Sequence, residues 1–425
     1  MNLISGKLMN EKESRAELER LKSLILEARE KAPLPVSSVI NACDTLSRAL
    51  DEREHLPLLL NLGMPEYKAR KDLQMIKHMM SKEYLENRLN IELGTPSREF
   101  SPYGDTLSVR QKWMPLGVLL HIAAGNVDAL PFFSVIEGLL TGNINILKLP
   151  GNDDGLSIRL LQELIKIEPL IAQYVFVFDY PSQDIESMEK MMSAADAIVV
   201  WGGDEAVSAV RGMANPNTRI IEWGHKISFA YISGDVSDSD LEGIAYNICD
   251  TNQVFCNSCQ GLFIDTDSFN EVLMFSERFL RILERMADEL PNKNNTYLTA
   301  QKTLELYTEK LESVKHRKRV FSANNCSVIA YDDTALAPSY MFRNCWVRPL
   351  PRERLLAALS DYKNHLHTVA LVCAEQDKKV IETILTKTGV VRVTSGARMS
   401  KGYCGMPHDG EFSLRRYMKL MSYEY

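Results

Sequence analysis

The fold is set by Val118-Leu-Leu-His-Ile-Ala123, an apolar run typical of a buried strand, which precedes a predicted helix over residues 131–140 and a second strand, Asn145-Ile-Leu-Lys-Leu149. The alternation continues through predicted helices and strands over residues 156–167, 175–178, 185–193 and 197–201. Strands that alternate with helices in this way predict a parallel, doubly wound sheet with ligands at the carboxyl ends of its strands. The chain lacks a Gly-x-Gly-x-x-Gly fingerprint, so that common dinucleotide motif does not support the prediction.

The regions around this sheet divide the chain into four predicted parts. Apolar residues recur at helical spacing among charged ones from about residue 11 to residue 90, which predicts a helical lead-in over 1–95. A first α/β domain then spans 96–225, and a further run of strands and helices predicts a second α/β domain over 226–395. The tail over 396–425 is expected to return to the first α/β domain or to form an oligomer interface.

The composition is that of a globular protein with reduced thiols. The chain has 425 residues, 45% of them hydrophobic and 25% charged, which allows two or three domains with full cores. Its net charge of −7 argues against a nucleic-acid partner, and the basic run Lys315-His-Arg-Lys-Arg319 is more simply a solvated helix end than a landing site for a ligand phosphate. Eight cysteines, no secretory apolar region after Met1 and no membrane-length apolar run predict a cytoplasmic protein without disulfides.

A polar segment with two cysteines, Asn252-Gln-Val-Phe-Cys256-Asn-Ser-Cys259-Gln-Gly261, runs into the apolar triplet Leu262-Phe-Ile264. This arrangement can hold the Cys256 thiol at the mouth of a cleft, where the thiolate would be the useful nucleophile. A lone cysteine is more often a small buried residue than a nucleophile. Cys256 and Cys259 also form a Cys-x-x-Cys pair, as in thiol–disulfide oxidoreductases, although that motif usually opens a helix. His365-Leu-His367 is a single pair, so no metal site is predicted.

Four other segments carry residues suited to binding or catalysis at strand ends. Asn126 follows the first strand, where its amide could donate to an oxyanion, although an ordinary turn asparagine is the simpler interpretation. Lys148, with Gly151 close behind, could meet ribose or phosphate oxygens of a nucleotide, or is a solvated lysine. Trp201-Gly202-Gly203 leads from a strand into a helix and could form one wall of such a site. Glu222 follows an apolar strand beside a tryptophan, a setting suited to acid–base work or to a surface residue.

In this order and spacing, the segments resemble the aldehyde dehydrogenase superfamily. Asn126 matches the oxyanion asparagine of that superfamily, Lys148 matches its cofactor-ribose lysine, and Trp201-Gly202-Gly203 lies in place of its Gly-Ser turn. The resemblance implies an aldehyde-dehydrogenase-like α/β fold. Its parts would be a doubly wound parallel-sheet domain for the nucleotide cofactor, an α/β catalytic thiol domain and a helical N-terminus.

The nucleophile and the acid–base residue follow from the same resemblance. Glu222-Trp-Gly-His-Lys226 resembles the Glu-Leu-Gly-Gly-Lys motif of the superfamily. Asn252-Gln253, the cysteine after them and the apolar triplet match its nucleophile segment. On that register Cys256 takes the nucleophile position, and Cys259 falls in the turn before the strand.

The closer resemblance is to the long-chain acyl-CoA reductase (LuxC-type) branch, the reductase component of the fatty-acid reductase of luminescent bacteria. Its signs are Ala124-Gly125-Asn126-Val127, Trp201-Gly-Gly-Asp-Glu205 and the late Pro407-His408-Asp409-Gly410. The match covers roughly residues 90–425. The superfamily's Glu-x-Phe-Gly-Pro motif is missing from the sequence, and Met341-Phe-Arg-Asn-Cys-Trp346 lies about where it should be.

This branch implies an NADPH-dependent reductase that converts a long-chain fatty acyl-CoA, or an acyl group passed on by a partner protein, to the fatty aldehyde. Cys256 would carry the acyl group, Asn126 and the Cys256 backbone N–H would hold the oxyanion, and Glu222 would transfer a proton. His408 and Asp409 are expected to border the site. The nearest alternatives are a short-chain acylating aldehyde dehydrogenase and an NAD(P)-dependent aldehyde oxidiser. A thiol–disulfide oxidoreductase and an inactive scaffold are alternatives of a different class.

The cofactor preference is expected from the residues after Lys148. Many NAD-preferring relatives in the superfamily carry a glutamate three residues after that lysine, where its carboxylate repels the 2′-phosphate of NADP. Gly151 takes that position here, which predicts NADPH over NADH, although Asp153 and Asp154 would oppose this if their loop folded inward. The resemblance also implies a homo-oligomer, with an interface strand from residues 412–425.

Overall fold

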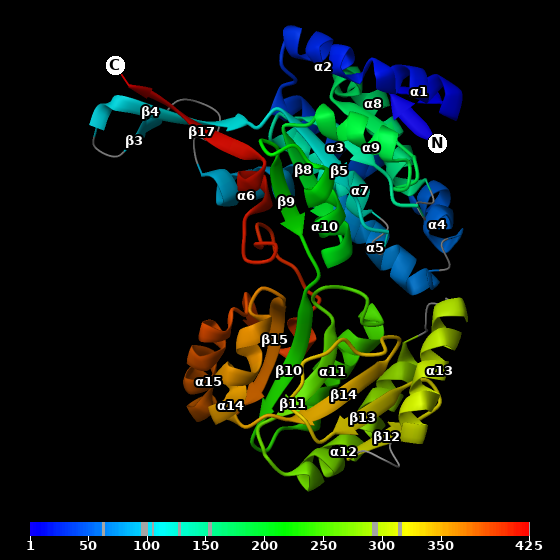
Figure 1. Cartoon of the computed structure of the whole chain (residues 1–425), viewed down its shortest axis with the longest axis vertical. Coiled ribbons are helices and arrows are strands. Elements are labelled where there is room, and N and C mark those ends of the chain that lie inside the picture. Colours follow the sequence, from blue (N-terminus) through cyan, green and yellow to red (C-terminus); the bar gives the residue numbers. More distant parts are fainter. Residues whose placement is uncertain are drawn as a thin grey trace. The chain divides into compact units, whose positions relative to one another are not determined.

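The computed structural model describes residues 1–61, 64–94, 101–103, 106–125, 129–151, 155–290, 296–312 and 317–424. The chain forms two compact units (Figure 1). Unit 1 comprises Met1–Leu62, Glu66–Gly224 and Tyr403–Tyr425, and unit 2 comprises Gly63–Pro65 and His225–Gly402. The helical N-terminus, the first sheet and the C-terminal segment from Tyr403 therefore share one unit, and the cysteine segment lies in the other.

The sheet of unit 1 has seven strands in the order β2-β1-β7-β6-β5-β8-β9. Its parallel strands are β5 (Val118–Ile122), β6 (Ile144–Lys148), β7 (Val175–Phe178), β8 (Ala197–Trp201) and β9 (Arg219–Trp223). Nearly every residue of β5, β6 and β7 is buried, as is usual for parallel strands covered on both faces. The predicted parallel, doubly wound sheet is confirmed.

The helices that connect these strands also match the prediction. They are α7 (Leu130–Leu140), α8 (Leu156–Ile167), α9 (Ile185–Ser193) and α10 (Asp204–Met213), with a short 3₁₀ helix, η1 (Pro169–Gln173), after α8. α8 and α9 have the predicted bounds, and α7 begins one residue earlier than predicted. Apolar residues at helical spacing predict these helices, because each helix buries one face on the sheet.

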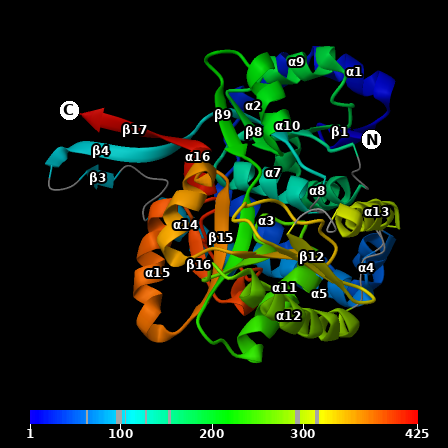
Figure 2. The same cartoon turned by 60° about the horizontal axis from the view of Figure 1, so that its bottom comes forward.

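The helical N-terminus is confirmed as well. Its helices are α1 (Glu11–Glu19), α2 (Leu21–Glu30), α3 (Val36–Ala49), α4 (Glu52–Asn61), α5 (Glu66–Met80) and α6 (Lys82–Leu93). α3 packs against α7 and α8, and α1 packs against α9, so these helices belong to the core of unit 1 (Figure 2). Ser81 separates α5 from α6, because its hydroxyl caps α6 by accepting a hydrogen bond from the Tyr84 N–H at 3.3 Å.

The first ten residues differ from the predicted helical lead-in. β1 (Asn2–Ile4) and β2 (Lys7–Met9) form a hairpin, and β1 pairs antiparallel with β7 at the edge of the sheet. Ser5 and Gly6 form its two-residue turn, both with positive φ (50° and 77°). A three-residue strand carries too little periodicity to be predicted, because its stability comes from the neighbouring strand.

A three-stranded antiparallel ribbon, in the order β17-β4-β3, extends from unit 1 (Figure 1). It consists of β3 (Ser101–Tyr103), β4 (Thr106–Pro115) and β17 (Met418–Glu424), and the short helix α16 (Ser413–Arg416) precedes β17. β17 pairs with β4 along its whole length, from Met418 opposite Pro115 to Glu424 opposite Val109. Thus β17 completes a ribbon whose other two strands lie about 300 residues earlier in the sequence.

Unit 2 contains a second seven-stranded sheet in the order β12-β13-β14-β11-β10-β15-β16. Its strands are β10 (Ile227–Ser233), β11 (Cys259–Ile264), β12 (Lys318–Ser322), β13 (Ser327–Tyr331), β14 (Asn344–Pro349), β15 (Leu366–Cys373) and β16 (Arg392–Thr394). Only the β12–β13 pair in this sheet is antiparallel among the described residues. Gly261 on β11 lies opposite Trp346, whose ring would be 2.0 Å from a Cβ added there, so the position requires glycine.

Helices cover both faces of this second sheet (Figure 2). The helices of unit 2 are α11 (Asp238–Thr251), α12 (Phe269–Glu289), α13 (Thr296–Glu312), α14 (Arg352–Leu359) and α15 (Glu375–Thr388), with 3₁₀ helices η2 (Ser360–Tyr362) and η3 (Gly396–Arg398). α11 and α12 share one apolar core with the sheet, and α14 and α15 share the core on its other face.

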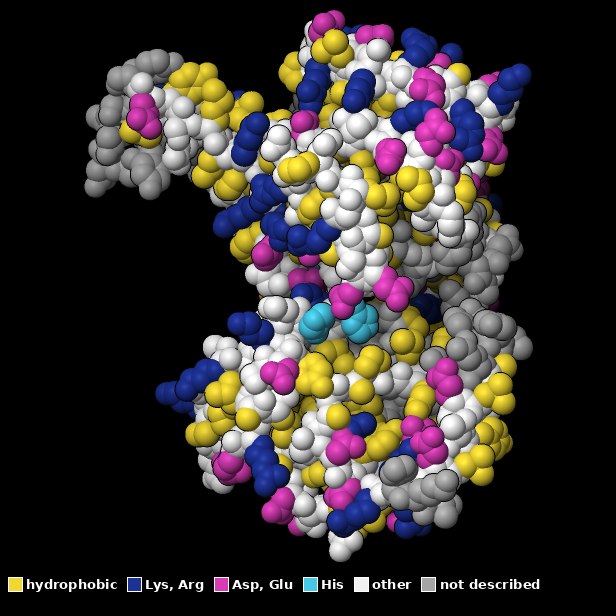
Figure 3. Space-filling model, viewed as in Figure 1, with side chains coloured by type: hydrophobic (Ala, Val, Ile, Leu, Met, Phe, Trp, Pro, Cys, Tyr) yellow, Lys and Arg dark blue, Asp and Glu magenta, His cyan; other side chains and the backbone are white. Residues whose placement is uncertain are grey.

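The basic run was predicted to be a solvated helix end, but its last two residues, Lys318 and Arg319, lie on β12. On the face drawn in Figure 3, charged side chains of both signs are interspersed with apolar ones in each unit. In the basic run, Lys318 forms ion pairs with Glu309 and Glu312 of α13, and Arg317 pairs with Asp332, whereas residues 315 and 316 lie outside the described part. Within the described ranges, every helix is too short or too polar to cross a membrane.

Candidate active site

The Cys256 loop connects α11 to β11 in unit 2. α11 ends at Thr251 with Asn252 as its C-cap, and both Asn252 and Gln253 adopt left-handed backbone angles (φ 47° and 63°). Cys256 is half-buried, and its carbonyl oxygen accepts a hydrogen bond from the Ser228 hydroxyl on β10 at 2.6 Å. The same hydroxyl oxygen accepts the Thr368 N–H of β15 at 3.0 Å. Two neighbouring strands therefore fix the backbone that carries this thiol.

Two buried glutamines fix the remainder of the loop. The Gln253 side-chain amide donates to the carbonyl oxygens of Cys259 and Gln260, at 3.0 and 3.4 Å. Gln260 donates in return to the Gln253 carbonyl at 2.9 Å, and its own side-chain oxygen accepts the Ser339 N–H at 3.0 Å. The nucleophile segment matched from the sequence includes Gln253, but no role was predicted for either glutamine. Their reciprocal bonds hold the start of β11 against the turn that precedes Cys256.

The segment Met341–Arg343 supports this loop from another part of unit 2. Its three residues have positive φ values of 57°, 48° and 71°, which is costly for side chains with a Cβ. The Phe342 N–H donates to the Asn252 carbonyl at 3.0 Å, and the Arg343 N–H donates to the Gln253 side chain at 3.1 Å. The Glu-x-Phe-Gly-Pro motif was expected here, and the residues found instead hold the Cys256 loop.

Arg343 is fully buried, although arginine rarely is. Its guanidinium donates to the carbonyl oxygens of Ala287 and Leu290 at 2.8 and 2.7 Å, which are otherwise left unpaired at the end of α12. It thus ties α12, whose side chains fill the core under β11, to the Cys256 loop.

Cys259 corrects one prediction. It was expected in the turn before the strand, but it is the first residue of β11 and is completely buried. Its N–H donates to the Asn247 side chain at 2.8 Å, and its thiol donates to the Gly261 carbonyl at 3.3 Å. Burial raises the pKa of this thiol to about 12, and all eight cysteines, each among the described residues, are outside disulfides. A Cys-x-x-Cys redox centre needs an accessible pair, which this burial opposes.

The predicted cofactor residues of unit 1 lie at the carboxyl ends of its parallel strands. Lys148, the last residue of β6, is buried and donates to the Ser182 hydroxyl at 2.9 Å. Burial lowers the pKa of Lys148, and the nearby Asp179 carboxylate acts in the opposite direction. Gly151 is exposed, with open space where a Cβ would be. Predicted residues Asn126, Asp153 and Asp154 lie outside the described part of the chain.

The structure brings together two predicted site residues that are far apart in the sequence. His408 lies against Trp201 at the end of β8, with 5.1 Å between ring centroids, and against Trp223 at the end of β9, with 4.8 Å. Asp409 follows in a tight turn closed by two backbone hydrogen bonds of 2.8 Å between His408 and Glu411. The late motif thus packs onto the carboxyl ends of β8 and β9 in unit 1.

Gly202 and Gly203 lead from this aromatic cluster into α10. Gly202 donates its N–H to the Trp223 carbonyl at 3.3 Å, and Gly203 is the residue before the first turn of α10. Asp204 and Glu205 occupy that first turn, where their charge disfavours a phosphate. These glycines are therefore better suited to a wall of the site than to a phosphate contact.

Glu222 lies within β9, not after it, and forms an ion pair with Arg211 of α10. This pair corrects the expectation of a carboxylate that projects from a strand end. A role in proton transfer would require Glu222 to leave Arg211.

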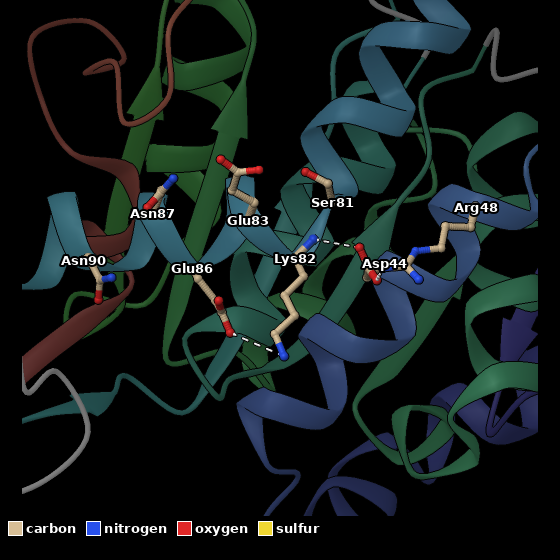
Figure 4. A pocket seen from close by; sticks show the side chains of 8 residues that line it. All are labelled: Asp44, Arg48, Ser81, Lys82, Glu83, Glu86, Asn87 and Asn90. Carbon is tan, nitrogen blue, oxygen red and sulfur yellow. Dashed lines mark hydrogen bonds and ion pairs between the residues drawn. The ribbon is translucent and has the colours of Figure 1, made fainter.

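A surface hollow of unit 1 lies between α3 and α6, away from the predicted residues (Figure 4). Its lining is polar: Asp44, Arg48, Ser81, Lys82, Glu83, Glu86, Asn87 and Asn90. The charges pair locally, with Asp44 2.6 Å from Arg48 and Lys82 3.8 Å from Glu86. Nothing in this lining indicates a ligand.

The residues at the carboxyl ends of the first sheet fit a nucleotide cofactor. Lys148 and Ser182 supply hydrogen-bond donors there, and the space around Gly151 lets a ligand approach the backbone. In the described residues there is no cluster of three metal-ligating side chains.

A family model described as acyl-CoA reductase (LuxC) matches residues 31–420. The chain belongs to this family. A long-chain acyl-protein thioester reductase from Aliivibrio fischeri is 25% identical over 427 residues, which cover 95% of this chain and 85% of the relative. The resemblance inferred from the sequence motifs is thereby confirmed.

Solved structures confirm the aldehyde-dehydrogenase-like fold of this LuxC-family chain. Betaine aldehyde dehydrogenase from Staphylococcus aureus superimposes with a TM-score of 0.72 at 14% identity, over 95% of this chain and 87% of that one. A bifunctional proline utilization A protein gives 0.76 at 14% identity, and the match spans 98% of this chain but 45% of the larger protein. The family makes this chain an oxidoreductase of the acyl-CoA reductase type.

Proposed function

We propose that this chain reduces a long-chain acyl thioester to the fatty aldehyde through an acyl group bound covalently to Cys256. The observation that carries the proposal is the Cys256 loop, in which Ser228, two buried glutamines and the Arg343 segment hold one half-buried thiol before β11. Membership in the acyl-CoA reductase family supports it, as does the name of the Aliivibrio relative. Cys259 is too deeply buried to serve instead.

In the proposed reaction, the Cys256 thiolate attacks the carbonyl carbon of the thioester, and the thiol of CoA or of an acyl-carrying partner protein leaves with a proton. The backbone N–H of Cys256 and the Asn126 amide hold the oxyanion. A nicotinamide cofactor, when bound, supplies the hydride, so that one acyl thioester, one reduced cofactor and one proton give one aldehyde, one thiol and one oxidised cofactor. Cys256 returns to the thiolate when the thiohemiacetal collapses.

Glu222 is proposed to move the proton in the thiohemiacetal step. It must first leave Arg211, so the two residues form a matched test. Glu222→Gln should slow aldehyde release, whereas Arg211→Gln should leave the carboxylate available and preserve activity. Equal losses of activity in both variants would mean that the ion pair has a structural role, and that Glu222 does not transfer the proton.

We propose that unit 1 binds the cofactor and that NADPH is preferred over NADH. Lys148 and Gly151 support this preference, the first as a cation and the second through the absence of a carboxylate. Asp179 near Lys148 acts against it. Trp201, His408 and Asp409 would border the nicotinamide or acyl end of the site.

The chain is also proposed to form a homo-oligomer through the ribbon. β17 is an edge strand whose Leu420 and Met421 are 52% and 41% exposed, which is unusual for apolar side chains on a free edge. Size-exclusion chromatography with light scattering would measure the state, and Leu420→Lys should shift it toward the monomer.

The decisive experiment follows NADPH oxidation with short-, medium- and long-chain acyl-CoAs and identifies the aldehyde by gas chromatography. Long-chain substrates should give the highest kcat/KM and a matching amount of aldehyde. Activity on short chains alone would favour a short-chain acylating dehydrogenase. Cofactor reduction by added aldehyde, without CoA dependence, would favour an aldehyde oxidiser.

A further inference from the structure

A histidine lies at the centre of the first sheet, where an apolar residue would normally be. His121 on β5 is fully buried within a run of apolar residues. Its Nδ1 is 2.6 Å from the Ser134 hydroxyl of α7, and its Nε2 is 3.0 Å from the Asn145 side-chain oxygen of β6. Buried polar groups of this kind reduce stability unless every one of them is paired. Their presence here therefore calls for a specific role.

The hydrogen bonds around His121 can run in only one direction. The Asn145 side-chain nitrogen donates to the Asn143 carbonyl at 2.8 Å, so its oxygen faces His121 and can only accept. His121 Nε2 must then carry the proton. Burial lowers the pKa of His121 to about 4, so the ring is neutral and Nδ1 accepts the Ser134 proton.

The chain of bonds ends on Trp201. Since the Ser134 proton points at His121, the Ser134 oxygen is free to accept, and the Trp201 indole N–H donates to it at 3.0 Å. The indole is thereby held by its polar edge at the carboxyl end of β8. Its ring lies 5.7 Å from that of Trp223 and 5.1 Å from that of His408.

Nearby packing leaves room for this arrangement. A Cβ at Gly138 of α7 would come within 1.7 Å of the Asn145 side-chain oxygen, so glycine keeps that oxygen in place to accept from His121. Tyr417 packs edge-on against His121 with 6.0 Å between ring centroids, and its hydroxyl also lies near Ser134 and Trp223. Both hydrogen bonds of the His121 ring are buried.

We infer that His121 and Ser134 are positioning residues that fix the Trp201 indole, and with it His408, for binding of the nicotinamide cofactor. This inference rests on the proposed function, because the contact between Trp201 and the cofactor is part of that proposal. A loosened indole would weaken the cofactor site, whereas the Cys256 loop is held by other residues, all of unit 2. Cofactor affinity should therefore change more than acylation of Cys256.

Ser134→Ala removes the acceptor for Trp201, and Ser157→Ala is the matched control. Ser157 is also a fully buried serine on a helix of unit 1, and within the described structure its hydroxyl has no hydrogen-bond partner. Both variants lose one buried hydroxyl, but only Ser134→Ala interrupts the hydrogen bonds between His121 and Trp201. Ser134→Thr retains a hydroxyl and should restore the wild-type behaviour. Circular dichroism verifies that each variant is folded.

Two measurements are made on each variant, binding of NADPH by titration and the tryptophan emission assigned to Trp201 by subtraction of the Trp201→Phe spectrum. Ser134→Ala should raise the Kd for NADPH about 2–10-fold, as expected for one lost hydrogen bond, and shift the Trp201 emission to the red. Acylation of Cys256 and the Ser157→Ala variant should remain near wild type.

The two possible failures are distinguishable. If Trp201→Ala weakens NADPH binding but Ser134→Ala changes neither the Kd nor the emission, His121 and Ser134 do not position the indole, and the inference is overturned. If Trp201→Ala leaves NADPH binding unchanged, the proposed cofactor role of Trp201 is wrong, and the functional part of the inference falls with it.

Discussion

The two cysteines of the loop should differ greatly in reactivity toward iodoacetamide. The thiolate is the reactive form, and a pKa of about 12 leaves roughly one Cys259 in 10⁴–10⁵ ionised near pH 7.5. Cys259 is also completely buried, whereas Cys256 is partly accessible. We therefore expect Cys256 to be alkylated at least about 10³ times faster than Cys259 in the folded protein.

Timed alkylation followed by peptide mass spectrometry measures both rates in one sample. Preincubation with a long-chain acyl-CoA should protect Cys256 and leave an acyl adduct on it. Cys256→Ala should abolish this adduct and aldehyde formation. Cys259→Ala should retain both, while the loss of its buried thiol lowers the free energy of unfolding by about 1–3 kcal/mol.

An acyl or alkyl adduct on Cys259 while Cys256 stays unmodified would refute this reasoning, because it would shift the nucleophile by three residues. A linked Cys256–Cys259 peptide after mild oxidation would instead show that the loop can open enough to form the disulfide.

Four further outcomes are expected. Asn126→Ala should lower kcat about 10²–10³-fold with a smaller change in KM, and a change in KM alone would make it a binding residue. Gly151→Glu, which has room for its side chain, should weaken NADPH more than NADH in titrations; equal effects contradict the predicted preference. The pKa of His121 is about 4 in the folded protein, below its ordinary 6.5. The contribution of the neutral ring to the free energy of unfolding is therefore complete above pH 6.5 and falls by up to about 3 kcal/mol toward pH 4. Urea titrations in which the free energy of unfolding has the same pH dependence in wild type and in His121→Leu would argue against this expectation. Gly261→Ala should lower the melting temperature of unit 2, since its Cβ would collide with the Trp346 ring. An unchanged melting temperature would mean that β11 or the Trp346 ring can shift without a loss of stability.

The sheet and its crossover helices could be predicted because their signals are local. β5 and β6 are apolar runs that are buried on both faces, and α8 has the helical period of a half-buried surface. The hairpin at Asn2–Met9 could not be predicted, because β1 is held by β7, more than 160 residues away. Likewise, β17 appears in the sequence as an ordinary tail until β4 is beside it.

In the candidate site, too, only the residues with a local sequence signal could be predicted. Lys148 and Trp201 could be found because each ends a recognisable strand, and Cys256 because it precedes one. The residues that position them were missed, because a buried Gln253 or His121 looks like any polar residue until its partner is known.

The missing Glu-x-Phe-Gly-Pro motif has a physical counterpart in unit 2. Three consecutive residues at Met341–Arg343 hold left-handed angles, each of which costs roughly 1 kcal/mol or more. The N–H groups of Phe342 and Arg343 face the left-handed turn at Asn252–Gln253 and satisfy its oxygens. The fully buried Arg343 side chain pairs the last carbonyls of α12. The backbone strain of Met341–Arg343 is therefore offset by the hydrogen bonds with which this segment holds the Cys256 loop.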